Sequence, residues 1–295
     1  MDTRHIQYFM AVYEHLHFTK AAEALGISQP TLSQQIRVLE AELGMPLFDR
    51  IGKQVVATEA GKLLHFHGGR MLLAEQDAKI AIRELMSSAR GTVRLSVLPS
   101  DLDFQLVPLF IHFHSEYPDI QLQAFSTIQI LEEVLSNRAD IGIALRTPPD
   151  KRLVQIPLRS EPYHLLVHSG SELAGRASIK LCELEQIPIV MYPRGFIGRE
   201  LVEKVCREKG GFQLSTVMET STAISLLQLV RAGVGATIQP VSLLKQESMR
   251  NEIIAIPISD HAPMRHLELI YGSERYISEA HRQLAKWLID FFSKS

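Results

Sequence analysis

The spacing of apolar residues divides the chain near residue 91. Before that point, apolar side chains recur every three or four residues, which predicts helices. Beyond Gly91, short apolar or alternating runs typical of strands are interleaved with helical segments. The pattern predicts a fold class of α+β and α/β, with a helical N-terminal part followed by a mixed α/β part.

The first 58 residues are expected to form a compact helical domain. A second helix of this domain is predicted at residues 20–25, with Thr19 as its N-cap and Gly26 as the left-handed residue that ends it. The first helix is indicated by four apolar side chains at helical spacing: Ile6, Phe9, Met10 and Tyr13.

A third helix and a hairpin complete this domain. Ser28 can cap the third helix, Pro30 is tolerated in its first turn, and the helix is expected to run to about residue 43. The segment RIGKQVVATEAG, residues 50–61, predicts two short strands around a turn at Gly52. A new helix is expected to start at Thr58.

The seven-residue repeat in residues 59–90 predicts one long linker helix. A seven-residue repeat of this kind is typical of two helices that pair, and the alternative is a single helix packed on a globular core. Gly68 and Gly69 fall inside the helix and are expected to mark a bend. The repeat consists of two interleaved series, Leu64, Met71, Ala78 and Leu85, and Ala60, His67, Ala74 and Ala81.

Residues 91–295 predict two similar α/β lobes. The first has strands at 92–99, 120–125 and 139–145 and helices at 104–117 and 130–136. The second has strands at 163–169, 187–192, 215–219 and 235–240 and helices at 198–208 and 222–232. A last strand at 267–272 and a helix at 278–292 are expected to return to the first lobe. Lobe I would then comprise residues 91–160 and 268–295, and lobe II residues 161–267.

The composition is that of an ordinary well-packed protein. The chain has 295 residues, 46% hydrophobic and 22% charged, with a formal net charge of −2 and therefore no global basic field. No apolar stretch approaches the roughly 18 residues of a membrane span, and the N-terminus does not have the pattern of a signal peptide. These features predict a cytoplasmic protein without a membrane partner.

The third predicted helix has two different faces. Leu32, Ile36 and Leu39 fall on one side of a helical wheel, and polar residues occupy a separate arc. Together with the small Ala21-Ala22 pair in the preceding helix, this pattern predicts a helix-turn-helix whose second helix enters the DNA major groove. The alternative is a plain solvated surface. The polar arc consists of Gln29, Pro30, Ser33, Gln34 and Arg37.

The chemistry of this arc suits base edges, but the local charge opposes DNA binding. Gln can pair with adenine and Arg with guanine, and the turn at Gly52 would act as a wing on phosphates. Residues 1–60 contain five Lys or Arg and seven Asp or Glu, a net charge of −2. DNA binding therefore requires positive charge on the DNA side and several copies acting together.

The segment FTKAAEALGISQPTLSQQIRVLEAELGMPLFDR, followed by VVATEAG, resembles the N-terminal signature of LysR-type transcriptional regulators. The rest of the chain is similar in architecture, with a linker helix and two α/β lobes like those of periplasmic binding proteins. Two positions depart from the pattern, since many relatives have Arg at Gln34 and Leu at Ala57. The resemblance implies DNA contacts by Gln29, Pro30, Thr31, Ser33 and Gln34 on the recognition helix, and by Arg50 and Lys53 in the wing.

Hydroxyl groups, a glycine and an arginine follow the predicted strands of the C-terminal lobes, where open α/β sheets bind ligands. Hydroxyls, helix N-terminal amides and Arg194 suit a carboxylate, whereas Asp101 would repel one. The alternative is that each hydroxyl merely caps a helix. By resemblance, the site takes a small effector, often an organic acid, with hydroxyl contacts at Ser100 and Thr127. The candidate residues are Ser100, Asp101, Thr127, Pro193, Arg194, Gly195, Phe196, Thr220 and Ser221.

The sequence offers little for catalysis. It contains neither a P-loop nor a GxSxG motif. His65, His67, His112 and His114 lack the spacing of a helical metal pair, and the spacing of Cys182 and Cys206 fits neither a disulfide framework nor a zinc site. No enzymatic activity, metal or cofactor is expected, and the two cysteines are expected to be small apolar residues.

The sequence therefore predicts a LysR-type transcriptional regulator that binds promoter DNA as a homodimer or homotetramer under the control of a small molecule between the lobes. Two alternatives remain, a ligand carrier or enzyme built on the lobes, and an architectural DNA binder without an effector.

Overall fold

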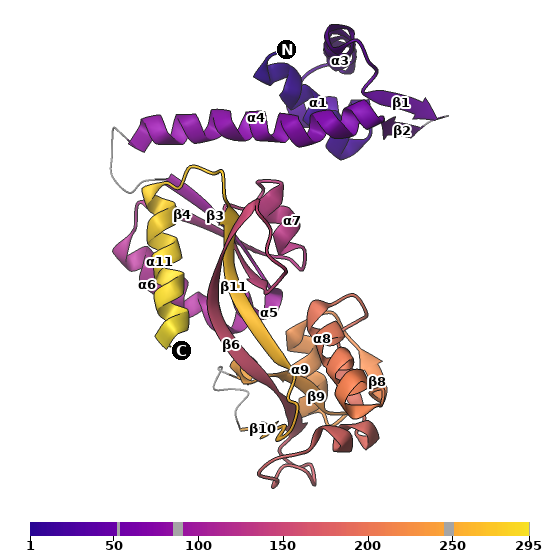
Figure 1. Ribbon diagram of the computed structural model, residues 1–295, viewed down its shortest axis with the longest axis vertical. Coiled ribbons are helices and arrows are strands. Elements are labelled where there is room, and N and C mark those ends of the chain that lie inside the picture. Colours follow the sequence, from indigo (N-terminus) through magenta and orange to yellow (C-terminus); the bar gives the residue numbers. More distant parts are fainter. Residues whose placement is uncertain (52–53, 85–90, 245–250, 295) are drawn as a thin grey trace. The chain divides into compact units, whose positions relative to one another are not determined.

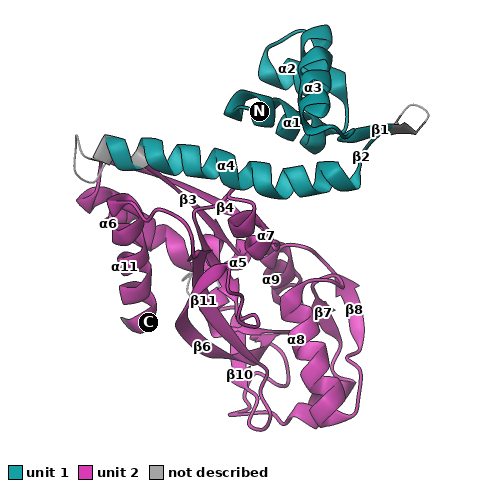
Figure 2. Cartoon of the chain, turned by 45° about the horizontal axis from the view of Figure 1, so that its top comes forward, with its two compact units in different colours: residues 1–86 teal, residues 87–295 magenta. Residues whose placement is uncertain are grey.

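The computed structural model describes residues 1–51, 54–84, 91–244 and 251–294 (Figure 1). Contacts within the chain divide it into two compact units, residues 1–86 and 87–295 (Figure 2). The long linker helix belongs to the first unit by this division. The finer boundary predicted at residue 58 and the lobe boundaries predicted within the second unit stay predictions.

The first unit is a small helical core with a hairpin. The side chains of Phe9, Leu32, Leu39 and Leu47 are fully buried in this core. The predicted three helices and the hairpin are confirmed. The elements are α1 (Thr3–His15), α2 (Phe18–Leu25), α3 (Gln29–Leu43), β1 (Phe48–Ile51), β2 (Gln54–Ala57) and α4 (Glu59–Glu84).

The N-cap predicted for α2 is wrong, whereas the predicted N-cap of α3, Ser28, is confirmed. Helix α2 begins at Phe18, and His17 is its N-cap, with Nδ1 accepting the N–H of Lys20 at 3.4 Å. Thr19 therefore lies inside the helix. The sequence pointed to Thr19 because hydroxyls are commoner caps, but a neutral imidazole nitrogen can accept the same hydrogen bond. Gly26 ends α2 at φ +66°, as predicted.

Helix α4 runs straight through its two glycines (Figure 1), so the predicted bend is wrong. Gly68 is buried, and a Cβ built on it would lie 2.8 Å from Ile6 Cγ2 on α1. The glycine therefore permits close helix packing. The residues of the predicted seven-residue repeat lie in two environments. Ala60 and Leu64 pack on the core of the unit, whereas His67, Met71, Ala74 and Ala78 are exposed. Leu85 lies outside the described residues.

The second unit is built on a seven-stranded sheet, ordered β10-β6-β11-β5-β3-β4, with β9 also paired to β6. A separate parallel pair joins β7 and β8. The strands are β3 (Gly91–Val97), β4 (Ile120–Ser126), β5 (Ile141–Leu145), β6 (Leu153–His168), β7 (Ile189–Met191), β8 (Thr216–Glu219), β9 (Thr237–Pro240), β10 (Ile253–Pro257) and β11 (Met264–Gly272).

Strand β6 is much longer than the predicted strand at 163–169 and joins the two lobes. Its residues 153–162 pair with β11, and residues 163–168 pair with β9 and β10. The sequence RSEP at residues 159–162 resembles a loop, but Pro162 stands where β6 changes partners, a position at which its missing N–H is tolerated. The two lobes therefore share a continuous strand (Figure 1).

The helices lie close to their predicted places, with one early start. The helix predicted at residue 104 already begins at Pro99, because proline is well suited to a first turn. The helices are α5 (Pro99–Asp101), a π-helical turn (Leu102–Leu106), α6 (Val107–Glu116), α7 (Ile130–Leu135), α8 (Ile197–Val205), a second π-helical turn (Cys206–Gly210), α9 (Ala223–Arg231) and α11 (Glu279–Lys294). Two short 3₁₀ helices occupy Leu181–Gln186 and Val241–Leu244.

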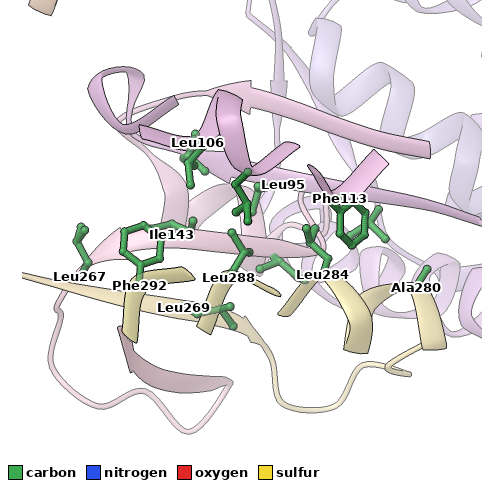
Figure 3. Close-up of a cluster of buried hydrophobic side chains, with 14 of the residues drawn as sticks. Leu95, Leu106, Phe113, Ile143, Leu267, Leu269, Ala280, Leu284, Leu288 and Phe292 are labelled. Carbon is green, nitrogen blue, oxygen red and sulfur yellow. The ribbon is translucent and has the colours of Figure 1, made fainter. Parts of the chain in front are cut away.

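The last strand and helix pack with strands of the first predicted lobe. Strand β11 pairs with β5, and α11 packs on the same core. Figure 3 shows Leu284, Leu288 and Phe292 of α11 against Leu95 and Ile143. This core holds α11 against β3, β5 and β11.

Candidate functional site

The outward face of α3 carries polar side chains that the fold does not use. Pro30, Gln34 and Arg37 are exposed, and Gln29 and Ser33 are half-buried. Among the described residues, the side chains of Gln29, Ser33, Gln34 and Arg37 make no hydrogen bond or ion pair. Their donors and acceptors are therefore available to a partner.

Polar side chains on the inner side of α3 are tied to the fold. Gln35 Oε1 lies 3.1 Å from His5 Nε2. Glu40 Oε1 accepts the N–H of Leu47 at 2.8 Å and so holds the start of β1. The apolar stripe of Leu32, Ile36 and Leu39 is buried beside them. The helix therefore has a fixed inner face and an unused outer face.

The remaining predicted DNA contacts lie at the cap and in the hairpin. Thr31 is exposed, and its hydroxyl lies 2.7 Å from Ser28 Oγ, which also accepts the Thr31 N–H at 3.2 Å. Arg50 pairs with Val55 across β1 and β2. The side chain of Arg50 and the whole of Lys53 lie outside the described residues.

A small pocket lies where the two lobes of the second unit meet. Its volume is about 60 Å³, well below the about 300 Å³ at which drug-sized ligands are usually bound. In this conformation it has room for roughly two groups of the size of a water molecule. It is lined by Leu98, Pro99, Ser100, Ile128, Leu145, Tyr163, Tyr192, Phe196, Ile197, Gly198, Ser221, Ala223, Gln239, Pro240 and Arg265.

Three helix N-termini reach this pocket. Pro99 and Ser100 begin α5, Phe196 is the N-cap of α8, and Ser221 precedes α9, whose N-cap is Thr222. Unpaired N–H groups and the helix dipole favour negative charge at such ends. The pocket therefore combines apolar walls with several positively polarised ends.

Arg265 is the charged residue of the pocket wall, and its charge is already compensated. Arg265 is 2% exposed, and its guanidinium donates to Asp101 Oδ1 at 2.8 Å and Ser242 Oγ at 3.1 Å. It also donates to the carboxylate of Glu161. Burial disfavours the charged guanidinium, but Asp101 and Glu161 prevail and raise the pKa of Arg265. Arg265 is thus permanently charged and paired.

The network continues behind the pocket. Arg159 donates to Glu161 Oε2 at 2.7 Å and to Gln105 Oε1 at 2.8 Å, and Gln105 donates to Asp101 Oδ1 at 2.6 Å. Two arginines therefore face two carboxylates, and the cluster has no surplus charge. An anionic ligand would have to rely on the helix N-termini.

Two tyrosines and a glycine form part of the pocket wall. Burial raises the pKa of Tyr163 to about 12 and also raises that of Tyr192, so both hydroxyls stay protonated near neutral pH and can donate. Tyr192 stacks on Phe196 with ring centroids 5.3 Å apart. A Cβ on Gly198 would lie 3.1 Å from Tyr163 Oη, so glycine keeps this wall open.

The nine predicted effector residues occupy different places. Ser100, Phe196 and Ser221 line the pocket. Asp101 is fully buried behind Arg265, and Thr127 Oγ1 accepts the N–H of Gln129 at 3.0 Å, as a local turn does.

The other four candidates border β7, β8 and α8. Pro193 is half-buried, and Arg194 and Gly195 are exposed. The N–H of Gly195 donates to Glu200 Oε1 at 3.1 Å, and that of Thr220 donates to Met191 O at 3.0 Å.

Arg265, Tyr163 and Gln239 also line the pocket and were not predicted from the sequence. A signal for Arg265 was present, because it shares the two-residue alternation of Leu267 and Leu269 in β11. An arginine on a buried strand face requires acidic partners. Its partners were not predictable, since Asp101 lies 164 residues away along the chain.

The comparisons with known proteins agree with this architecture. The model of the bacterial regulatory helix-turn-helix protein of the lysR family matches residues 3–62, and that of the LysR substrate binding domain matches residues 87–293. The chain therefore belongs to the LysR family of transcriptional regulators, with a DNA-binding helix-turn-helix and an effector-binding domain. In the described part of the chain, no helix is long and apolar enough to cross a membrane.

Three relatives illustrate the range of the family. The chain is 33% identical to the transcriptional dual regulator GltC of Bacillus subtilis, over 100% of this chain and 98% of the relative. It is 27% identical to a hydrogen peroxide-inducible genes activator of Dickeya chrysanthemi, over 97% and 94%. The structure of full-length CbnR with its target DNA has a TM-score of 0.67 at 22% identity, covering 100% of this chain and 99% of CbnR.

The cysteines of this chain bear on the peroxide response named for one relative. Cys206 is buried, and burial, together with the charge of Glu203, raises the pKa of its thiol to about 11. A thiolate is the reactive species, so this thiol is poorly suited to oxidation near neutral pH. Cys182 is exposed.

Proposed function

We propose that this regulator reads DNA sequence with the outward face of α3. The observation that carries the proposal is the contrast between the two sides of this helix. Inner polar groups such as Gln35 and Glu40 are bonded to the fold, whereas Gln29, Ser33 and Gln34 make no bond with the described residues. Amide and hydroxyl groups of this kind can pair with base edges in the major groove.

Copies of the chain are proposed to pair through α4. Its exposed apolar side chains include Leu63, Phe66, Met71 and Ile82, with Leu63 64% and Ile82 63% exposed. Large apolar residues along one solvated helix are typical of a helix-pairing surface. Pairing brings two recognition helices to two half-sites and compensates for the weak positive charge of one copy. We place the protein in the cytoplasm, where promoter DNA is found in bacteria.

A matched pair of glutamine variants tests the DNA proposal. Gln34→Ala should weaken binding to a duplex that the wild-type protein selects from a random library by about 1–3 kcal/mol. Gln7→Ala, on the exposed side of α1, should leave binding unchanged. Fluorescence anisotropy gives both affinities. Equal affinities for the two variants would remove Gln34 from the interface.

We further propose that the pocket between the lobes holds a small organic anion. The helix N-termini at Ser100, Phe196 and Ser221 supply the attraction, and Tyr163 and Tyr192 supply hydroxyl donors. Because the charge of Arg265 is already compensated by Asp101 and Glu161, the site favours ligands with a single anionic group. Since the pocket has a volume of only about 60 Å³, ligand binding must select a more open lobe arrangement.

Glycine variants test the effector proposal. Gly198→Ala should narrow the pocket against Tyr163 and lower the affinity for small carboxylates, whereas Gly175→Ala meets nothing within 4 Å and should not. Calorimetry of the full chain against a panel of small carboxylates gives the affinities. A response to hydrogen peroxide that is lost in Cys206→Ala, with no carboxylate binding, would favour a thiol switch instead.

A further inference from the structure

A second and larger cavity lies between α11 and the sheet, away from the pocket between the lobes. Its volume is about 260 Å³, and it shares no lining residue with that pocket. Its floor is formed by Ile141 of β5, Ile156 of β6 and Tyr271 of β11. Ala285 and Ile289 of α11 form the facing wall. The regulator function proposed above makes no use of this cavity.

The walls favour an apolar guest of modest length. Apolar side chains dominate the lining, and transfer of apolar surface from water into such a space is favourable. At about 30 Å³ for each group of the size of a water molecule, the cavity has room for roughly nine such groups. An alkyl chain of a medium-length fatty acid has this size.

The rim of the cavity is positively charged. Lys286 is exposed and makes no ion pair with the described residues. Arg282 also lines the cavity, but its charge is shared with Glu279, to which it donates at 2.9 Å. Lys286 therefore provides an uncompensated positive charge at the opening, where a charged group of a guest would remain near water.

A buried histidine, His281, lies at the inner end of this group of side chains. His281 lines the cavity and is 4% exposed. Its Nδ1 lies 2.5 Å from Ser278 Oγ, whereas its Nε2 makes no hydrogen bond with the described residues. Asp140 Oδ2 lies 3.6 Å from Nε2 and accepts from Arg94 Nε at 3.1 Å, whereas Arg275 donates to the other oxygen, Oδ1, at 2.7 Å. Nε2 therefore faces the Asp140 carboxylate, and the case for a ligand rests on the apolar cavity and on Lys286.

We propose that this cavity is a second small-molecule site, which takes a monocarboxylate with a single apolar chain. The chain would lie against Ile141, Ile156 and Ile289, and the carboxylate would face Lys286. An alcohol of equal length would have the same alkyl chain but no negative charge to face Lys286. An amine would carry a positive charge, which Lys286 repels. The site thus discriminates by the sign of the head group.

Calorimetry of the full chain with octanoate, octanol and octylamine tests this site. Octanoate should bind most tightly and octylamine most weakly. Lys286→Glu should lower the octanoate affinity by about five-fold or more, whereas Lys204→Glu, an exposed lysine on α8, should not change it. Because Lys286 is exposed, its replacement should leave the thermal unfolding temperature unchanged.

Two blocking variants separate the two sites. Ala285→Trp should fill the cavity and abolish octanoate binding, and Ile128→Trp should fill the pocket between the lobes without affecting it. Octanoate binding that is lost in Ile128→Trp but kept in both Lys286→Glu and Ala285→Trp would overturn the proposal. Equal affinities for octanoate and octanol would overturn its charge selectivity, and undetectable binding of all three probes would overturn the site.

Discussion

The outward face of α3 and the cluster around Arg265 are both polar, but they differ in how far the protein satisfies them. Arg265 is buried and bonded to Asp101, Glu161 and Ser242. Gln34 and Arg37 on α3 are exposed and unbonded to the described residues. Polar groups already paired within the fold serve the fold, whereas solvated groups on a rigid helix are available to a partner.

The difference has an energetic consequence. Removing one member of a buried, paired cluster leaves a charge without its counterion in a poorly solvated place. Removing a solvated side chain leaves nothing buried and changes stability little. Substitutions in the buried Arg265 cluster should therefore change stability, whereas substitutions on the outward face of α3 should change DNA binding.

The largest expected effect is on the Arg265 cluster. Arg265→Met would leave Asp101 and Glu161 with only Arg159 nearby, and should lower the free energy of unfolding by about 3–5 kcal/mol. Arg37→Met makes the same chemical change on α3 and should alter it by less than about 0.5 kcal/mol. Urea unfolding followed by circular dichroism measures both. Equal losses would contradict the distinction.

The acid side of the stability curve sharpens the comparison for Asp140. Burial opposes ionisation of Asp140, but His281, Arg94 and Arg275 prevail and hold the pKa of its carboxyl below the ordinary value of 3.8. Its stabilising contribution is therefore present above that ordinary value and is lost as the pH falls from there towards the lowered pKa.

The corresponding experiment is unfolding of the full chain between pH 6 and pH 2. This range spans the pKa of an ordinary carboxyl group, which is roughly 4. Asp140→Asn should destabilise the protein at pH 6 and flatten the loss of stability below it. Asp290→Asn, on the exposed side of α11, should leave the wild-type slope. A steep acid transition retained in Asp140→Asn would assign the pH dependence to other groups.

A smaller effect compares two hydroxyls of the helix-turn-helix. Ser28 Oγ accepts the Thr31 N–H at the start of α3, so Ser28→Ala should lower the free energy of unfolding by about 1 kcal/mol. Thr19 is exposed inside α2 and is not its cap, so Thr19→Ala should be near neutral. Thermal unfolding measures both variants, and a loss for Thr19→Ala equal to that for Ser28→Ala would contradict the placement of Thr19 inside α2.

The sequence predicted most of the elements because helical and strand periodicities are local properties. It predicted the hairpin, the capped α3 and the return of α11 for this reason. It missed the length of β6, because pairing with β9, β10 and β11 overrides the polar and proline residues in its middle. It also read Gly68 as a bend, since the close approach of Ile6 is a tertiary contact.

The candidate site was predictable to the extent that it depends on local chemistry. The polar arc of α3 and the hydroxyls Ser100 and Ser221 could be identified from position alone. Arg265 and Tyr163 could not, because they come from the two strands that cross between the lobes. The ion pair in which Asp101 compensates the charge of Arg265 could not be predicted from the sequence either. This ion pair changes which ligands the pocket favours.

The most direct test of the central claim is a salt series of DNA binding by the wild type and by Gln29→Ala combined with Ser33→Ala. Each protein is titrated with its selected duplex and with random duplex, so that base reading is separated from phosphate contact. We predict that the double variant loses its preference for the selected duplex while the salt slope and the free energy of unfolding stay unchanged. An unchanged preference in the double variant would contradict the assignment of the outward face of α3 to base recognition.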